Sequence, residues 1–455
     1  MSADPDVLFL VLDSVRKDRV SWYGHDRETT PTLDAFAERA TAFDNAYAPA
    51  PWTLPSHCSM FTGLYPSEHG VTNGFADGTP RLPGGTRTLA ERLADRGYRT
   101  AGFSNNPWVG QLSGLDRGFR EFVEWDLEIG RSDSGADVHD RPARLASRAH
   151  ALLGQAARQP VFLLKRRFFT RRLVDRACDW FAATADGDRP TFTFLNLMEA
   201  HSPYFPPGAA FERLGLASPS PVEPRVLNTK LLAYVMGKRS LPEAERRRVM
   251  AYYDASLRFQ DGQVARLFET LRDQGRLDDA LVVVCADHGK TLGDVDRDST
   301  PPHYTRDVNV NVPLFVSRPG QTDARAVTDP FELASLHDLV LDGGERPADR
   351  SRSDPSAALV EDHLPHTGRS SPDAVTRWRV LAADRHKYVR SDDGDEFLLA
   401  RRDGTETPVA DESTTATFRE ALARRTGDLE PVTGDGEAAA IDDAVQSQLR
   451  DLGYM

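Results

Sequence analysis

VLFLVLDS, from Val7 to Ser14, is the stretch that decides the fold. Its apolar residues are continuous and do not alternate with polar ones, which is typical of a parallel strand buried on both faces. Two later stretches repeat this pattern: TFTFLNLM from Thr191 to Met198, and ALVVVCADHG from Ala280 to Gly289. We therefore predict a mainly parallel sheet that contains these three strands.

Helical patterns lie between the strands, as the crossovers of a parallel sheet require. The predicted helices are, in chain order, Thr30–Phe43, Thr88–Gly97, an Arg-rich segment near Leu145–Thr184, and Ala244–Gln274. YRTAGFSN, from Tyr98 to Asn105, and VPLFVSRPG, from Val312 to Gly320, are expected to add two more strands. Strands that alternate with helices predict an α/β fold with the sheet covered on both faces.

The composition of the chain changes after about residue 342, where Asp, Arg, Ser and Pro replace most apolar residues. Trp378–Arg402 then shows short alternating segments with turn signals at Asp392–Asp395, which predicts an antiparallel meander. The predicted division is a large α/β domain (1–342), a linker or surface excursion (343–372), a small C-terminal α+β sheet subdomain (373–430) and a tail (431–455).

The charges of the chain argue against nucleic acid as a partner. Its 455 residues carry a formal charge of −13, and an acidic surface repels phosphates. The chain has 50 Arg beside 6 Lys and 47 Asp beside 22 Glu, a bias typical of salt-loving organisms or of a GC-rich genome. No window approaches the roughly 20 apolar residues of a membrane span, and no signal peptide is recognisable. We therefore expect a cytoplasmic protein.

Ligand-type side chains follow three of the predicted strands. Asp13 ends the first, His201 comes shortly after the second, and Asp287 and His288 follow the third. An open α/β sheet binds its ligands at these carboxyl ends. Each residue alone has an ordinary explanation as a cap, a turn former or a hydrogen-bonding histidine, so the prediction depends on their joint occurrence. Oxygen and imidazole ligands without thiolate favour Mg, Ca, Mn or Zn.

PWTLPSHCSMFTGLYP, from Pro51 to Pro66, predicts a helix with a reactive hydroxyl at its start. Pro55 suits a first helical turn and Gly63 suits a helix end. Thr53 would then lie at the N-terminal end, where unpaired N–H groups and the helix dipole favour anions. A hydroxyl bound to a divalent cation there loses its proton more easily and becomes a nucleophile.

With these stretches the sequence resembles the sulfatase family of the alkaline phosphatase superfamily. The resemblance also covers FSNNPW with GLDRGF, MEAHSPYFPP and HKYVRSDDGDEFLLARRDGTETPVADES, and so extends over nearly the whole chain. It implies an alkaline phosphatase-like fold: a large mixed, mostly parallel sheet between helices, and a smaller C-terminal antiparallel sheet.

The resemblance also implies roles for single residues. The metal ligands implied are Asp13, Asp287, His288 and Thr53; the catalytic residues are Thr53, His201 and His303; and the substrate-binding residues are His57, Lys290 and Asn105, with Asn106 beside it. In these roles Thr53 is the nucleophile, and His201 or His303 contacts the leaving-group oxygen. Lys290 stands where relatives often carry Glu, and it either holds an anionic substrate or pairs with a nearby Asp.

Two departures from the family pattern change the expected chemistry. Sulfatases carry Cys or Ser in a C/S-x-P-x-R motif and convert it to formylglycine. Thr53-Leu54-Pro55-Ser56-His57 stands here, and threonine cannot be converted. The family's double Asp after the first strand is Asp13-Ser14, so one carboxylate is missing. We therefore expect one divalent cation and no formylglycine. The cysteines, Cys58, Cys178 and Cys285, form no CxxC pair, and Cys58 is expected to be a packed thiol.

The sequence thus predicts a metal-dependent hydrolase of sulfate, phosphate, phosphodiester or phosphonate esters. Its expected substrates are small molecules or glycans, and its expected intermediate is an ester of Thr53. Thr nucleophiles occur among relatives that act on phosphoryl groups, which keeps both ester classes open. Two alternatives stay open as well: a transferase that moves a phosphate-linked group to a sugar or lipid, and a binding protein that descends from the enzyme. The sequence does not indicate an oligomeric state.

Overall fold

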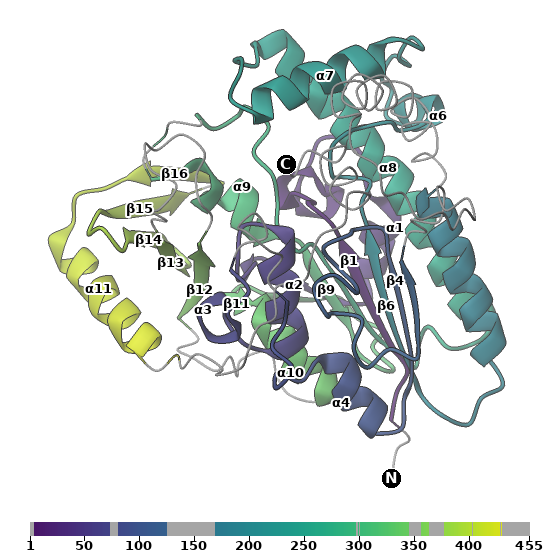
Figure 1. Ribbon diagram of the computed structural model, residues 1–455. Helices are drawn as coiled ribbons and strands as arrows, with labels where there is room; N and C mark the ends of the chain where they lie inside the picture. Colours follow the sequence, from purple (N-terminus) through teal and green to yellow (C-terminus); the bar gives the residue numbers. More distant parts are fainter. Residues whose placement is uncertain are drawn as a thin grey trace, which may run out of the picture.

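A large sheet lies between two layers of helices, and a smaller antiparallel sheet packs beside it (Figure 1). This computed structural model describes residues 4–72, 81–124, 169–296, 299, 301–344, 356–363, 377–402, 404–427 and 429. The predicted fold class is confirmed. The predicted tail (431–455), the start of the Arg-rich segment and most of the predicted linker lie outside the described residues.

The two central strands of the large sheet, β7 (Leu281–Cys285) and β1 (Val7–Leu12), are buried along their whole length. Among the described residues its order is β10-β2-β9-β7-β1-β6-β4-β5. The strands are β1 (Val7–Leu12), β2 (Thr41–Phe43), β4 (Arg99–Ser104), β5 (Glu121–Glu124), β6 (Thr191–Leu197), β7 (Leu281–Cys285), β9 (Leu314–Ser317) and β10 (Arg325–Val327). β1 pairs in parallel with β6 and β7, and β9 runs antiparallel to β7 and β2. The sheet is therefore mixed and mostly parallel, and β1, β6 and β7 end at the same edge.

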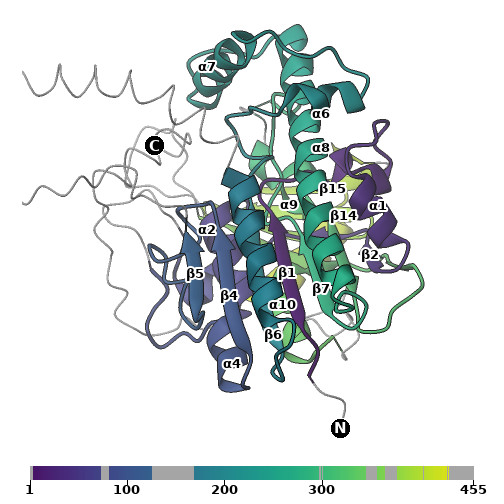
Figure 2. The same ribbon diagram turned by 90° about the vertical axis from the view of Figure 1, so that its right-hand side faces the viewer.

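Helices cover both faces of this sheet. The described helices are α1 (Pro31–Ala37), α2 (Thr53–Thr62), α3 (Pro66–His69), α4 (Leu89–Asp95), α6 (Gly208–Arg213), α7 (Glu223–Val235), α8 (Glu243–Asp273), α9 (Asp307–Val310), α10 (Leu336–Leu341) and α11 (Glu412–Gly427), with the 3₁₀ turns η1 (Lys17–Arg19), η2 (Ser21–Tyr23), η3 (His303–Thr305) and η4 (Leu333–Ser335). α2, α4 and α10 lie on one face, and α1, α8 and helical residues 169–184 lie on the other (Figures 1 and 2). No helix in these described ranges combines the length and apolar character that crossing a bilayer would require.

The helix α2 forms as the sequence predicts. Pro55 lies in its first turn, and Gly63 ends it with φ 71°, a left-handed conformation that favours glycine. The ring of Phe61 packs against Phe9 of β1 and Phe194 of β6, with centroids 6.2 and 4.8 Å away. These contacts fix the helix across the central strands, with its N-terminal end toward the edge where the strands end.

Two predicted segments differ from the structure. The helix predicted over Thr30–Phe43 ends at Ala37, and Thr41–Phe43 forms β2, because strand pairing with β9 and β10 outweighs the local helical pattern. Residues 357–362, predicted as part of the linker, form the strand β12 (Ala357–Asp362). β12 is hard to recognise from the sequence because it is a short edge strand inside polar sequence, and its buried residues do not alternate with exposed ones.

The C-terminal sheet is the predicted antiparallel meander with β12 added. Its strands are β12, β13 (Trp378–Ala383), β14 (His386–Ser391), β15 (Glu396–Arg402) and β16 (Thr405–Pro408). A three-stranded sheet of β3 (Ala46–Tyr47), β8 (Asn311–Val312) and β11 (Phe331–Glu332) lies between it and the large sheet. The fully buried Lys387 of β14 pairs with Asp307 of α9, and Arg401 of β15 donates to the same carboxylate at 2.9 Å. These buried charges fix the small sheet to α9.

His69, at the end of α3, is a fully buried imidazole. Its Nδ1 accepts the N–H of Val71 at 3.1 Å, so its Nε2–H donates to Ser59 of α2, also at 3.1 Å. Burial disfavours the charged form and lowers the pKa of His69 to about 3, from 6.5. The folded protein therefore excludes a proton that the unfolded chain binds. Above pH 6.5 neither state binds this proton, so the free energy of unfolding is unaffected. As the pH falls from 6.5 toward 3, only the unfolded chain binds it, and the free energy of unfolding decreases.

Replacing His69 by Gln tests this linkage. Gln has no group that titrates in this range, so the free energy of unfolding should depend less steeply on pH. Between pH 4 and 6 we expect the slope to fall by about 1.4 kcal/mol per pH unit. Denaturant unfolding of both proteins at several pH values measures the slope. An unchanged slope would show that His69 takes up its proton in the folded state.

Candidate active site and metal centre

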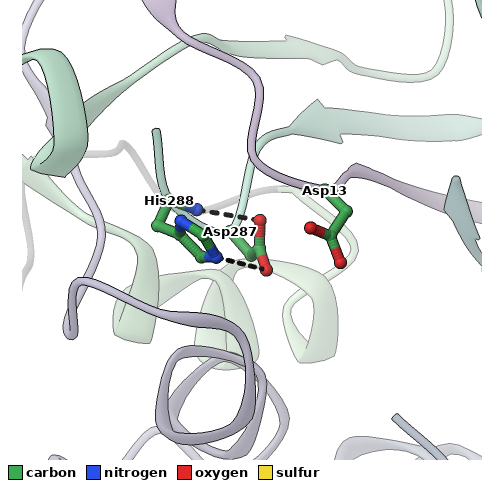
Figure 3. A group of neighbouring side chains, drawn as sticks. All are labelled: Asp13, Asp287 and His288. Atoms are coloured by element: carbon green, nitrogen blue, oxygen red, sulfur yellow. Dashed lines mark hydrogen bonds and ion pairs between the residues drawn. The ribbon is translucent and has the colours of Figure 1, made fainter. Parts of the chain in front are cut away.

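Three ligand-type side chains meet where β1 and β7 end (Figure 3). Asp13 follows β1, and Asp287 and His288 follow β7. Each offers one ligand atom, and the three atoms lie within 4.8 Å of one another. Both carboxylates are fully buried, and His288 is nearly so. Strands far apart in sequence thus bring together the three side chains that the sequence predicts as metal ligands.

Ser14 positions both carboxylates. Its N–H donates to Asp287 Oδ1 at 2.9 Å, and its hydroxyl donates to Asp13 Oδ1 at 2.8 Å. These bonds require a backbone φ of 61° at Ser14, a left-handed conformation unusual for a residue with a side chain. The hydroxyl of Tyr253 in α8 donates to the Ser14 carbonyl at 2.8 Å and so holds this turn. The residue that replaces the family's second Asp therefore has a positioning role.

The two carboxylates differ in charge state. Burial disfavours the charge of Asp13, but His201, His288 and hydrogen bonds from Ser14 and Asn106 outweigh burial and hold the pKa of Asp13 below its ordinary value. Burial and the neighbouring charge of Asp13 raise the pKa of Asp287 well above its ordinary value. Two adjacent buried carboxyl groups cannot both ionise cheaply, so the pair tends to keep one proton.

These residues fit a divalent cation. Asp287 Oδ2 is buried and has no hydrogen-bond partner among the described residues, although such groups are normally paired. The nearest basic atoms are ring nitrogens, His57 Nδ1 at 3.5 Å and His288 Nε2 at 3.6 Å. A bound cation would satisfy this oxygen and offset the repulsion between the carboxylates. The set of two carboxylates and one imidazole suits the oxygen- and nitrogen-binding cations expected from the sequence.

Thr53 lies at the start of α2 with its hydroxyl toward this cluster. Thr53 Oγ1 is 3.2 Å from His288 Nε2. His288 Nδ1 lies 2.6 Å from the Gly289 carbonyl and must donate its hydrogen there, so Nε2 carries the lone pair. The contact is therefore a hydrogen bond from the Thr53 hydroxyl to an imidazole. The predicted nucleophile and the predicted metal ligands occupy one site.

His57 is placed differently from its prediction as a substrate-binding residue. It is fully buried one turn along α2, and its Nδ1 donates to the Thr53 carbonyl at 2.9 Å. Burial lowers the pKa of His57 to about 4, so the ring is neutral near pH 7. These contacts support the helix start and the Asp287 carboxylate, and they suit a positioning role better than a contact with substrate.

His201 and Lys290 come from the loops after β6 and β7. His201 Nδ1 lies 2.6 Å from the Ser202 carbonyl, and the ring interacts electrostatically with Asp13. Lys290 Nζ donates to the Ser202 hydroxyl at 2.9 Å. The two loops are thereby joined, and the predicted leaving-group histidine lies near the metal ligands.

The remaining predicted residues have less direct support. His303 begins η3, and its ring packs against Tyr304 with centroids 5.2 Å apart. Its catalytic role stays a prediction. Asn105 is buried after β4, but its neighbour Asn106 is the residue that contacts the site: Asn106 Nδ2 donates to Asp13 Oδ2 at 2.7 Å. The FSNNPW stretch thus reaches Asp13 through Asn106, while no contact of Asn105 with the cluster is present among the described residues, and its substrate-binding role stays a prediction.

Ser14 and Tyr253 are the residues that sequence reasoning missed. From the sequence, Ser14 indicates only the loss of a carboxylate, although serine beside a strand-end Asp is also a signal for a hydrogen-bonding turn. Nothing in the sequence around Tyr253, in the middle of a long helix, indicates that its hydroxyl reaches a turn 239 residues away.

Comparisons with known proteins identify a family and several relatives. The family model described as Sulfatase matches residues 5–340, about three quarters of the chain. An ulvan-active sulfatase of Formosa agariphila is 25% identical over 87% of this chain and 74% of its own length. An arylsulfatase of Clostridium perfringens is 23% identical over 74% of each chain.

A solved structure extends the likeness to the whole fold. The phosphonate monoester hydrolase of Agrobacterium radiobacter superposes with a TM-score of 0.67 at 18% identity. The similarity covers 93% of this chain and 95% of that one. At this level of identity the match concerns the fold.

Replacing Asp287 by Asn tests the electrostatics of the cluster. An amide cannot ionise beside Asp13, so the metal-free variant should be more stable than the metal-free parent, by about 1 to 3 kcal/mol. The parent should gain about 2.7 kcal/mol from a divalent cation at a hundred times its Kd, and the variant much less. Thermal unfolding with chelator and with each cation measures both effects.

The matched control is Asp278→Asn, which changes an exposed carboxylate and should respond to the cation like the parent. If Asp287→Asn gained as much stability from the cation as the parent does, the assignment of Asp287 as a metal ligand would be contradicted.

Proposed function

The chain belongs to the sulfatase family of the alkaline phosphatase superfamily, a group of sulfuric and phosphoric ester hydrolases. We propose that it cleaves sulfate or phosphate esters, including diesters and phosphonates, through a covalent intermediate on Thr53. The proposed site holds one divalent cation through Asp13, Asp287 and His288, with the Thr53 oxygen beside it. Its proposed substrates are small molecules or glycans that carry such an ester.

One observation carries this proposal: the Thr53 hydroxyl lies at the start of α2 and 3.2 Å from His288 Nε2, inside the cluster of metal ligands. A threonine that served only as a helix cap would need neither the imidazole nor the carboxylates. The first N–H groups of a helix have no partner inside it, so they can stabilise negative charge on a substrate held against Thr53.

Different residues would hold the cation, position its ligands and attack the ester in the proposed reaction. Bound there, a divalent cation would supply Lewis acidity, which lowers the pKa of the Thr53 hydroxyl and offsets the charge of the ester. Ser14 and Asn106 hold Asp13, and the Ser14 and His288 amides hold Asp287. Thr53 attacks sulfur or phosphorus in line with the leaving oxygen, and water then releases the Thr53 ester.

Lys290 and His201 suit the outer part of the site. Lys290 is partly exposed and carries positive charge beside His288, which favours an anionic ester group. His201 Nδ1 is bonded to the Ser202 carbonyl, so Nε2 is the ring nitrogen that would protonate the leaving oxygen. These roles are part of the proposal.

The identity of residue 53 bears on the substrate. A hydrated formylglycine can expel its sulfate by forming an aldehyde again, whereas a threonine ester must be hydrolysed at sulfur or phosphorus. That requirement suits phosphoryl esters, for which attack by water on a covalent ester is an established type of step. We therefore expect the phosphodiester and phosphonate members of a substrate panel to turn over faster than the sulfate ester.

Replacing Thr53 by Ala tests the nucleophile. We expect kcat to fall by about a thousandfold or more on nitrophenyl sulfate, phosphate, phosphodiester and phosphonate esters, because the oxygen that forms the intermediate is gone. Cation-dependent stabilisation should remain, since three ligands are intact. Thr62→Ala, at the other end of the same helix, is the matched control and should keep its activity. Full activity of Thr53→Ala would remove Thr53 from the mechanism.

Replacing His201 by Gln tests the proposed acid. An acid matters most when the leaving group is poor, so the variant should lose about a hundredfold or more on an alkyl ester and much less on the nitrophenyl ester. The same pair of measurements on His303→Gln compares the other candidate. The histidine whose removal gives the leaving-group-dependent loss is the acid. Equal losses on both esters in both variants would exclude this role for either residue.

A further inference from the structure

The helix α7 is apolar on two sides. Leu227, Leu231 and Tyr234 are buried and face the rest of the protein. A second apolar group points to solvent: Val222, Val226, Leu232, Val235 and Met236 are 38 to 64% exposed. Only two other large apolar residues, Trp22 and Val409, reach comparable exposure in the described part of the chain. The outer face of α7 is therefore an unusual concentration of exposed apolar surface.

The charge around this face is opposite to that of the whole chain. The full sequence has 69 acidic and 56 basic residues. Residues 222–248 instead contain three acidic residues and seven basic ones: Arg225, Lys230, Lys238, Arg239, Arg246, Arg247 and Arg248. Five of the seven form ion pairs with the three acidic residues: Lys230 and Arg239 with Glu245, Arg246 and Arg247 with Glu243, and Arg248 with Glu223. Arg225 and Lys238 are exposed and form no ion pair with the described residues, so their charge is the part that faces solvent beside the apolar side chains. An apolar helical face flanked by Lys and Arg is the pattern of helices that lie in the surface of an anionic membrane.

α7 also lies close to the active-site edge. β1 runs from the N-terminal end of the molecule toward the end where α7 lies, and both views agree on this (Figures 1 and 2). Asn228 of α7 accepts the N–H of Tyr204 at 2.7 Å and donates to the Tyr204 carbonyl at 2.8 Å. Tyr204 follows His201 by three residues. The helix α7 and the strand ends therefore belong to the same end of the protein.

We propose that the outer face of α7, formed by Val222, Val226, Leu232, Val235 and Met236, binds the surface of a bilayer that contains anionic lipid. The apolar side chains enter the boundary between head groups and acyl chains, and the basic residues contact the lipid phosphates. A second copy of the chain fits this face less well, because two surfaces of the same positive charge repel each other. The inference that the active-site edge then meets esters at the membrane rests on the proposed function. The inference that α7 binds the membrane does not depend on that function.

Vesicle flotation tests the proposal on the full chain. The parent should bind phosphatidylcholine vesicles that contain phosphatidylglycerol, and phosphatidylcholine vesicles less well. The variant Val226→Ser, Leu232→Ser, Met236→Ser should lose about tenfold or more in partitioning, because its apolar contacts are gone. Arg225→Glu with Lys238→Glu should lose the preference for phosphatidylglycerol, and added salt should weaken that preference in the parent.

The matched control removes exposed apolar side chains elsewhere. Trp22→Ser with Val409→Ser should bind vesicles like the parent, and thermal unfolding of every variant shows whether the fold survives. The proposal is wrong if the parent binds neither vesicle, or if the triple variant folds and binds like the parent. Sedimentation velocity tests the alternative that a second copy of the chain binds this face. If the parent self-associates without binding vesicles and the triple variant stays monomeric, the face is an interface between copies and the proposal is wrong.

Discussion

Two carboxyl groups, Asp13 and Asp287, are buried side by side at the ends of adjacent parallel strands, and the rest of the site depends on this unfavourable contact. Their proximity follows from topology, because β1 and β7 are neighbours that run in the same direction. Burial removes the water that would solvate both charges. The protein holds the pair in place with neutral donors, the Ser14 amide and hydroxyl and the Asn106 amide, which leave the negative charge itself for a cation. Stability and function therefore oppose each other at this point.

The imidazoles of the site are oriented by the main chain. His57, His201 and His288 each place Nδ1 within 2.9 Å of a backbone carbonyl, those of Thr53, Ser202 and Gly289. Because Nδ1 is held, the distal nitrogen of each ring has a fixed direction. The site is thus organised by backbone bonds that exist before any substrate arrives, which reduces the reorganisation that a reaction would require.

The parts of the structure that follow from local pattern could be predicted from the sequence. Continuous apolar runs located β1, β6 and β7, and proline and glycine located both ends of α2. The strand-end positions of Asp13, Asp287 and His288 then followed from the topology of parallel sheets. The parts that depend on tertiary contacts could not be predicted. β2 forms because β9 and β10 lie beside it, and Asn106 rather than Asn105 reaches Asp13 because consecutive side chains point in different directions.

A continuous series of contacts connects the surface of α7 to the carboxylates. Asn228 holds the backbone of Tyr204, whose ring packs edge-on against Tyr253 with centroids 5.8 Å apart. The Tyr253 hydroxyl in turn donates to the Ser14 carbonyl and accepts the Arg16 amide, each at 2.8 Å. Since Ser14 bonds both carboxylates, a displacement of α7 would be transmitted through two aromatic rings to the turn that sets the spacing of Asp13 and Asp287. The Ser14 turn and the apolar face of α7 are therefore joined by direct contacts, although 208 or more residues separate them in the sequence.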